Sequence, residues 1–149
     1  MMPAIMRKIN VITRCGGQYR TEQLGNDELG APHHSFVLAV CNHPGMSQDR
    51  LAKHLCLNKS TVARVLNYLE EKGYVTRTAS ETDRRVLLVE PTEKMRAVYP
   101  EVRRITAEWN ARLSEEIAPD ELALFFDVLG RMEARAKELI ENRDGGGEK

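Results

Sequence analysis

The chain has 149 residues, of which 42% are hydrophobic and 30% are charged, and its formal net charge is zero. This length suits one domain with a sizeable core, and three cysteines without CxxC spacing argue against a disulfide framework. No apolar stretch reaches the length of about 18 residues that a membrane-spanning helix needs, and residues 1–13 lack the apolar core of a signal peptide. We therefore expect a cytoplasmic protein that has no membrane partner.

The charged residues are unevenly distributed along the chain. Residues 50–85 contain eight lysines and arginines but only four acids, whereas residues 101–149 contain eight basic and twelve acidic residues. This asymmetry indicates that the middle of the chain binds a polyanion, although chance clustering explains the charges equally well when they are taken alone.

The first expected element is a helix over about residues 4–23, whose apolar positions include Ile5, Ile9 and Ile12. Gly16-Gly17 lies inside it. Because each glycine costs about 1 kcal/mol in a helix interior, we expect the helix to be weak or bent there unless packing holds it. After the linker GNDELGAP, a short apolar helix is expected over about residues 33–41.

Residues 47–73 carry the clearest pattern in the sequence. Ser47 suits the N-cap of a helix that ends near Leu55, and Asn58 suits the N-cap of a second helix that Gly73 ends. The apolar residues of the second helix follow the stripe of a helix packed on one side, at Val62, Val65, Leu66 and Leu69. Two short helices joined by a few residues, the second with polar and basic residues facing outward, predict a helix-turn-helix.

A β-hairpin is predicted directly after the second helix. Residues 74–78 and 86–89 have the composition and alternation of strands, and the polar residues 79–84 form the turn between them. A hairpin in this place makes a winged helix. The expected fold class is therefore mostly α with a small β-hairpin wing, and the winged helix spans about residues 32–91.

Two longer helices are expected after the hairpin. Thr92 suits the N-cap of a helix that reaches about Ile117 and that Pro100 kinks, and Pro119 starts another that ends near Glu141. These helices carry more apolar side chains than a helical hairpin could bury by itself, which favours dimerisation. An ordinary core formed with the winged helix would account for some of these side chains. These residues are Trp109, Phe125, Phe126, Leu129 and Met132.

The second helix of the helix-turn-helix carries candidate DNA-binding residues. The major groove of B-DNA admits an α-helix whose first residues reach base edges. Arg64 can donate two hydrogen bonds to guanine, and Thr61 offers a methyl group to thymine. Lys59 and Ser60 suit phosphate oxygens, and Asn67 completes the predicted set. A merely solvated helix face is the alternative, and the caps, the stripe and the hairpin together disfavour it.

The tip of the hairpin holds the adjacent Arg84 and Arg85, which can enter a narrow minor groove. Asp83 beside them is unfavourable near phosphates. We interpret it as a scaffold that pairs with a neighbouring arginine and fixes the shape of the wing. The candidate partners are Arg85, Arg77 and Arg64.

An ordered set of short motifs runs through residues 44–95. The motifs are Pro44-Gly45 with Ser47, Leu51-Ala52, Lys59-Ser60-Thr61-Val62 with Arg64, Leu69-Glu70 with Lys72-Gly73, Asp83-Arg84-Arg85 and Thr92-Glu93. At these spacings the segment resembles the core of the MarR (multiple antibiotic resistance regulator) family of bacterial transcription regulators. The sequence departs from the family pattern at Gly16-Gly17, Pro91 and Met95.

The resemblance implies a sequence-specific repressor that is relieved by a small phenolic or aromatic ligand. It implies a homodimer on a pseudo-palindromic operator of double-stranded DNA, with dimerisation helices over about residues 4–23 and 92–141. We therefore expect a single domain over residues 1–143 and a flexible tail over residues 144–149.

Two other signals remain open at this point. Cys15 lies one helical turn from Tyr19 and is a possible redox sensor, although a free cysteine is most often a small hydrophobe, as Cys41 and Cys56 are expected to be. Metal sensing would need a ligand set, and we expect surface or capping roles for the histidines instead, with no metal site and no cofactor. The four histidines are His33, His34, His43 and His54.

Enzymatic function is not expected, because the sequence has no glycine-rich phosphate loop, no nucleophile–base motif and no clustered carboxylates. The remaining alternative to a DNA-binding protein is a winged helix that binds another protein.

Overall fold

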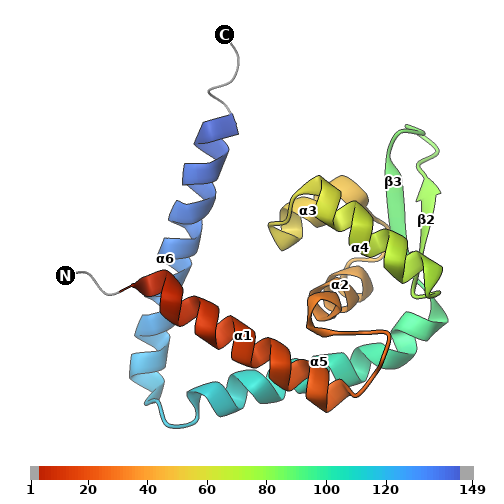
Figure 1. Cartoon of the computed structure of the whole chain (residues 1–149). Coiled ribbons are helices and arrows are strands. Elements are labelled where there is room, and N and C mark those ends of the chain that lie inside the picture. The colour runs from red at the N-terminus through yellow and green to blue at the C-terminus, as the bar shows by residue number, and fades with distance from the viewer. Residues whose placement is uncertain (1–3, 145–149) are drawn as a thin grey trace. The chain divides into compact units, whose positions relative to one another are not determined.

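The computed structural model describes residues 4–144, in which six helices and three strands follow one another along the chain (Figure 1). The elements are α1 (Ile5–Leu24), α2 (Ala31–Asn42), β1 (Met46–Ser47), α3 (Gln48–Leu55), α4 (Lys59–Glu71), β2 (Val75–Ala79), β3 (Leu87–Pro91), α5 (Glu93–Ser114) and α6 (Pro119–Asp144). This confirms the predicted fold class, mostly α with a small β-hairpin. None of the helices within this part combines the length and the apolarity that crossing a membrane requires.

The chain divides into two compact units, one reaching Trp109 and the other beginning at Asn110. The first contains a three-stranded antiparallel sheet in the order β1-β3-β2. In the hairpin, Val75 pairs with Pro91 and Ala79 with Leu87, and β1 pairs through Met46 with Val89. The sequence did not predict β1, because two residues are too few to show a strand periodicity.

The core of the first unit lies between α2, α3, α4, the sheet and the first half of α5. The predicted stripe of α4 is buried at Val62, Leu66 and Leu69, so the periodicity identified the correct face. Other fully buried residues are Leu29, Phe36, Val37, Leu51, Val75, Val89, Met95, Val102 and Ile105.

The glycine pair of α1 is a packing site. α1 is a single helix of 20 residues that runs through both glycines, and Gly16 is its buried residue. A Cβ atom at Gly16 would lie only 2.9 Å from Nε1 of Trp109, whose ring also contacts Tyr19 with centroids 5.3 Å apart. The glycine pair was expected to weaken or bend the helix unless packing held it. The close approach of the indole to the α1 backbone is that packing.

The helices at the end of the chain differ slightly from the expected bounds. α5 contains Pro100 and ends at Ser114, short of Ile117, whereas α6 continues past Glu141. The predicted flexible tail lies outside the described residues, apart from Asp144 at the end of α6. The aromatic and apolar side chains of α6 are mostly exposed in the single chain, including Leu124, Phe125, Phe126, Val128, Met132, Leu139 and Ile140.

Candidate nucleic-acid interface

The start of α4 is built by its cap. The Asn58 side chain accepts a hydrogen bond of 2.7 Å from the Thr61 N–H and another of 2.9 Å from the Ser60 hydroxyl. This satisfies one of the N–H groups that a helix leaves unpaired at its N-terminus. Lys59 forms an ion pair of 3.6 Å with Asp49 that is exposed on both sides and therefore contributes little to stability.

The predicted base-reading residues lie along one face of α4. Ser60, Arg64 and Asn67 follow each other at i, i+4 and i+7, and all three are exposed, as is Lys59, while Thr61 is half-buried. The carboxamide oxygen of Asn67 accepts a hydrogen bond from the Arg77 guanidinium. Asn67 therefore already has a partner within the protein, whereas the sequence predicts only a contact with DNA for it.

The turn between α3 and α4 corrects one expectation about the cysteines. Cys56, predicted to be a structural residue at an apolar position, is exposed and forms the C-cap of α3 in the left-handed conformation, with φ of 53°. Its N–H donates to the Lys53 carbonyl at 3.2 Å. Cys41 is half-buried, and burial raises the pKa of its thiol.

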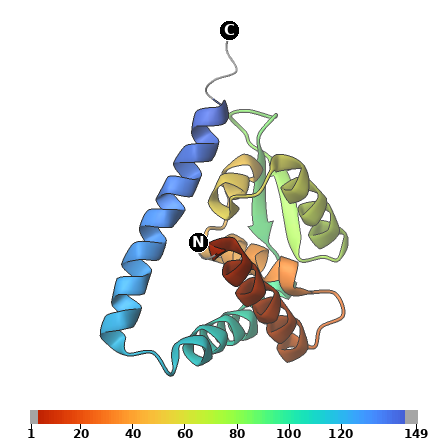
Figure 2. The ribbon, with the colours of Figure 1, turned by 60° about the vertical axis from the view of Figure 1, so that its left-hand side comes forward.

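The wing is the loop between β2 and β3, and in both views it projects beyond α3 and α4 (Figures 1 and 2). Of the three candidate arginines, Asp83 pairs with Arg85. Its carboxylate accepts from the Arg85 backbone N–H at 3.1 Å, from Nε at 3.2 Å and from Nη2 at 3.4 Å. These bonds, the side-chain ones first, lower the pKa of Asp83. Arg84, next in the chain, is exposed.

Replacing Asp83 with alanine is expected to weaken DNA binding, although the change removes a negative charge. The carboxylate accepts hydrogen bonds from both the backbone and the side chain of Arg85. Without it the free wing is less ordered, so ordering the wing on DNA costs more conformational entropy. A fluorescence-anisotropy titration at fixed salt measures the affinity, and Asp83→Asn is the matched control that retains acceptor oxygen. Tighter binding by Asp83→Ala would contradict the scaffold role.

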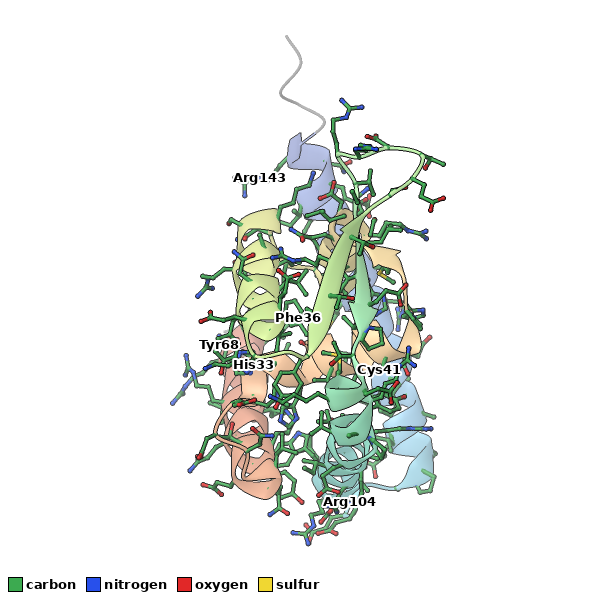
Figure 3. All side chains as sticks on the ribbon, turned by 90° about the vertical axis from the view of Figure 1, so that its right-hand side faces the viewer. His33, Phe36, Cys41, Tyr68, Arg104 and Arg143 are labelled. Atoms are coloured by element: carbon green, nitrogen blue, oxygen red, sulfur yellow. The ribbon has the colours of Figure 1, made fainter. Side chains whose placement is uncertain are left out.

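The far end of α4 is tied to the start of α2. The rings of His33 and Tyr68 stack with centroids 4.9 Å apart, and the two residues lie side by side in Figure 3. The Tyr68 hydroxyl donates to the Glu28 carbonyl at 2.7 Å, and Nδ1 of His33 accepts from the Gly30 N–H at 3.0 Å. His33 thus has a capping role, one of the two roles expected for the histidines.

His34 was wrongly expected to be a surface or capping residue. Its side chain is 2% exposed, and neither ring nitrogen has a hydrogen-bond partner among the described residues; the same holds for the buried Nε of Arg20. Burial, followed by the positive charge of Arg20 and the influence of His33, lowers the pKa of His34 to about 4. The apolar neighbours in the α2 sequence, Phe36 and Val37, were the available signal that this helix is buried on most sides.

The other candidates for metal binding and redox sensing are the remaining histidines and Cys15. Within residues 4–144, no three histidine, cysteine or acidic side chains are grouped so that they could hold a metal ion. His43 and His54 contact each other edge-on with ring centroids 5.2 Å apart. Cys15 is exposed on α1, and Tyr19 packs against Trp109.

Comparison with known proteins shows a likeness to one family of regulators, which is strongest in the winged helix. Residues 31–87, from α2 to the start of β3, match the model of the MarR family. The HTH-type transcriptional regulator YybA of Bacillus subtilis is 27% identical over 103 residues, which cover 69% of each chain.

Solved structures extend the likeness to the flanking helices. A MarR transcriptional regulator from Methanosarcina mazei Go1 is 26% identical, with a TM-score of 0.81 over 91% of this chain and 97% of that one. A Listeria monocytogenes protein assigned to the same family, solved in complex with 26mer DNA, has a TM-score of 0.88 at 22% identity, over 99% of both chains. Residues 31–87 of the chain thus match the MarR family of transcriptional regulators, and nearly the whole chain is similar in fold to solved regulators of that family.

Proposed function

We propose that the protein is a sequence-specific DNA-binding repressor that acts in the cytoplasm as a homodimer and is relieved by a small phenolic or aromatic ligand. The observation that carries the DNA-binding part is the combination of a capped helix with exposed Lys59 and Arg64 and a projecting wing with exposed Arg84 and Arg85. The Listeria relative with this fold was solved with DNA, which supports the same use of the surface.

The chemistry of the two elements suits different grooves. Arg64, on the second turn of α4, can donate two hydrogen bonds to O6 and N7 of guanine in the major groove. The wing arginines suit the negative potential of a narrow minor groove. Lys59 lies at the N-terminus of α4, where the helix dipole and the free N–H groups favour phosphate. The surface therefore combines direct base readout with contacts to the backbone and groove shape.

The proposed homodimer is supported by exposed apolar side chains at both ends of the chain. Large contiguous apolar patches are uncommon on monomeric proteins and mark interaction surfaces. In this reading residues 1–143 act as one MarR-like domain, in which the winged helix spans about 32–91 and the dimerisation helices about 4–23 and 92–141. Besides the residues of α6, α1 exposes Ile5, Met6, Val11 and Ile12.

The proposed ligand response is supported by the buried polar groups of Arg20 and His34. A buried donor or acceptor without a partner costs about 1–3 kcal/mol, so a ligand that supplies the missing partner binds favourably. A phenolic hydroxyl can donate to a neutral imidazole nitrogen of His34, and a carboxylate can accept from Nε of Arg20. Release of bound operator DNA by hydroxybenzoates, followed by fluorescence anisotropy, tests this part of the proposal.

Replacing Arg64 with alanine is expected to relax the sequence preference at one base pair by about 1–3 kcal/mol, because the bidentate contact to guanine is lost. An operator is first selected by the protein from random-sequence DNA. The measurement is the affinity for this operator divided by the affinity for each of its single-base variants. Arg103→Ala removes an exposed arginine of α5 and is the control. If Arg64→Ala keeps full discrimination between these fragments, the winged helix does not read DNA through α4, and a protein-binding role becomes the better explanation.

A further inference from the structure

We propose that Arg77 is a positioning residue that fixes the wing relative to the recognition helix, so that α4 and the wing engage one DNA segment as a rigid unit. This inference rests on the proposed DNA-binding function. Arg77 lies on β2, the first strand of the hairpin, opposite Val89 of β3.

The guanidinium of Arg77 connects three elements of the winged helix. Its side chain is 14% exposed, and its contacts reach back from β2 to α4 and α3. Nη2 donates to the Asn67 carboxamide oxygen and, at 3.2 Å, to Glu70 Oε1; Nε donates to Glu70 Oε2 at 3.4 Å; and Nη1 donates to Gln48 Oε1 at 3.2 Å. The backbone N–H of Arg77 also donates to Glu70 Oε2 at 3.1 Å.

The chemistry of this cluster requires arginine. A planar guanidinium presents five donors in a fixed geometry, so one side chain can hold acceptors on two helices at once, which a lysine ammonium cannot do at these positions. The hydrogen bonds from the Arg77 side chain are also the main cause of the lowered pKa of Glu70. The same contacts thus favour the charged form of the Glu70 carboxylate, which accepts hydrogen bonds from the strand.

The cluster acts on the surface that faces DNA. Asn67 continues the exposed face of α4 that holds Ser60 and Arg64, and its side-chain oxygen is the one that Arg77 contacts. The helix face that reads bases is thus hydrogen-bonded to the strand that carries the wing. By contrast, Asp83 and its partner Arg85 both belong to the loop. Their contact therefore orders the tip of the wing but does not fix the position of the hairpin relative to α4.

A fixed spacing matters because the two grooves of B-DNA are fixed relative to each other. If the wing were loosely held, each wing contact would have to be ordered on binding and would contribute less affinity. Rigid attachment therefore couples the wing arginines to α4. The coupling can be measured as the interaction energy of a double-mutant cycle.

The test combines Arg77→Met with Arg84→Ala. In the wild-type background, Arg84→Ala is expected to weaken operator binding about tenfold. In the Arg77→Met background it should weaken binding by less than about threefold, because a wing that is not held in place contributes little to the affinity. Glu70→Ala, which removes the main acceptor of the cluster at a half-exposed site, is expected to reduce the effect of Arg84→Ala in the same way. Arg77→Lys should not restore the coupling, and Arg103→Met, elsewhere in the same unit, should leave the tenfold effect intact.

The outcomes separate this inference from the proposed function. Thermal unfolding of each variant shows that the protein is folded, and a purely structural role would lower the melting temperature without changing the ratio of affinities. If Arg84→Ala weakens binding equally in the wild-type, Arg77→Met and Glu70→Ala backgrounds, Arg77 does not position the wing, and DNA binding by α4 and the wing still stands. If neither Arg64→Ala nor Arg84→Ala changes operator affinity in the wild-type background, the DNA-binding proposal itself fails and this inference with it.

Discussion

Replacing His34 with phenylalanine is expected to remove about 3 kcal/mol of pH dependence from the free energy of unfolding between pH 6.5 and pH 4. The imidazole is buried, and neither of its nitrogens has a partner among the described residues, so the folded protein keeps it neutral. Phenylalanine retains an aromatic ring of similar size and has no group to titrate.

The sign of the effect follows from the two pKa values. In the unfolded chain His34 takes up a proton as the pH falls below 6.5, whereas in the folded protein burial and the nearby Arg20 lower its pKa to about 4. Within this window the unfolded state binds more protons. The stabilisation is therefore fully present above pH 6.5 and is lost as the pH falls to about 4.

Urea unfolding followed by circular dichroism, at several pH values and one protein concentration, measures this effect. Several carboxylates whose pKa is lowered by ion pairing, such as Glu70 and Asp83, also destabilise the fold as they are protonated, so the informative quantity is the difference between wild type and variant. His54→Gln removes an exposed imidazole, leaves His34 in place and is the matched control. If His34→Phe and the wild type lose stability in parallel down to pH 4, His34 is not a buried neutral group.

The winged helix could be predicted because its signals are local. Caps at Ser47 and Asn58, the buried stripe of α4 and the polar turn of the hairpin are each encoded within a few residues, and the structure shows Ser47 accepting from Arg50 and Asn58 from Thr61. The candidate base-reading positions followed from the same register, because the stripe that is buried determines the face that remains exposed.

What the sequence could not predict depends on contacts between distant segments. Gly16 meets Trp109, which lies several elements further along the chain, and no local pattern indicates that an indole covers a helix backbone. Asp83 pairs with Arg85, and Arg77 pairs with Glu70. Which partners meet likewise depends on the three-dimensional course of the hairpin. The burial of His34 was missed because the typical surface role of histidine outweighed the apolar character of its helix.

Replacing Met132 with glutamate is expected to dissociate the proposed homodimer into monomers. It should weaken operator binding by about 100-fold or more, because two linked half-site contacts become one. Met132 belongs to a stripe of α6 at helical spacing, formed by Phe125, Val128, Met132, Ala136 and Leu139. Most of these residues and two arginines line a shallow groove on α6, at Val128, Arg131, Met132, Arg135, Ala136 and Leu139.

The size of the effect follows from the cost of burying a charge. In the single chain Phe125 is 53% exposed and Met132 is 38% exposed, so apolar area remains to be covered by a second copy at about 25 cal/mol per Å². A carboxylate in the centre of such an interface loses its hydration and costs several kcal/mol, which exceeds what one methionine contributes by packing. Dissociation of the dimer is thus the expected response to the charge.

Light scattering coupled to size-exclusion chromatography gives the mass, and an anisotropy titration gives the affinity for the operator. Ala134→Glu is the matched control, because it introduces the same side chain two residues away, about 200° around the helix from Met132, where the surface is exposed and outside the stripe. That variant should remain a dimer with wild-type affinity. A Met132→Glu protein that is still dimeric would show that the groove of α6 lies outside the interface, and one that is monomeric but binds operator at wild-type affinity would show that a single winged helix suffices for recognition.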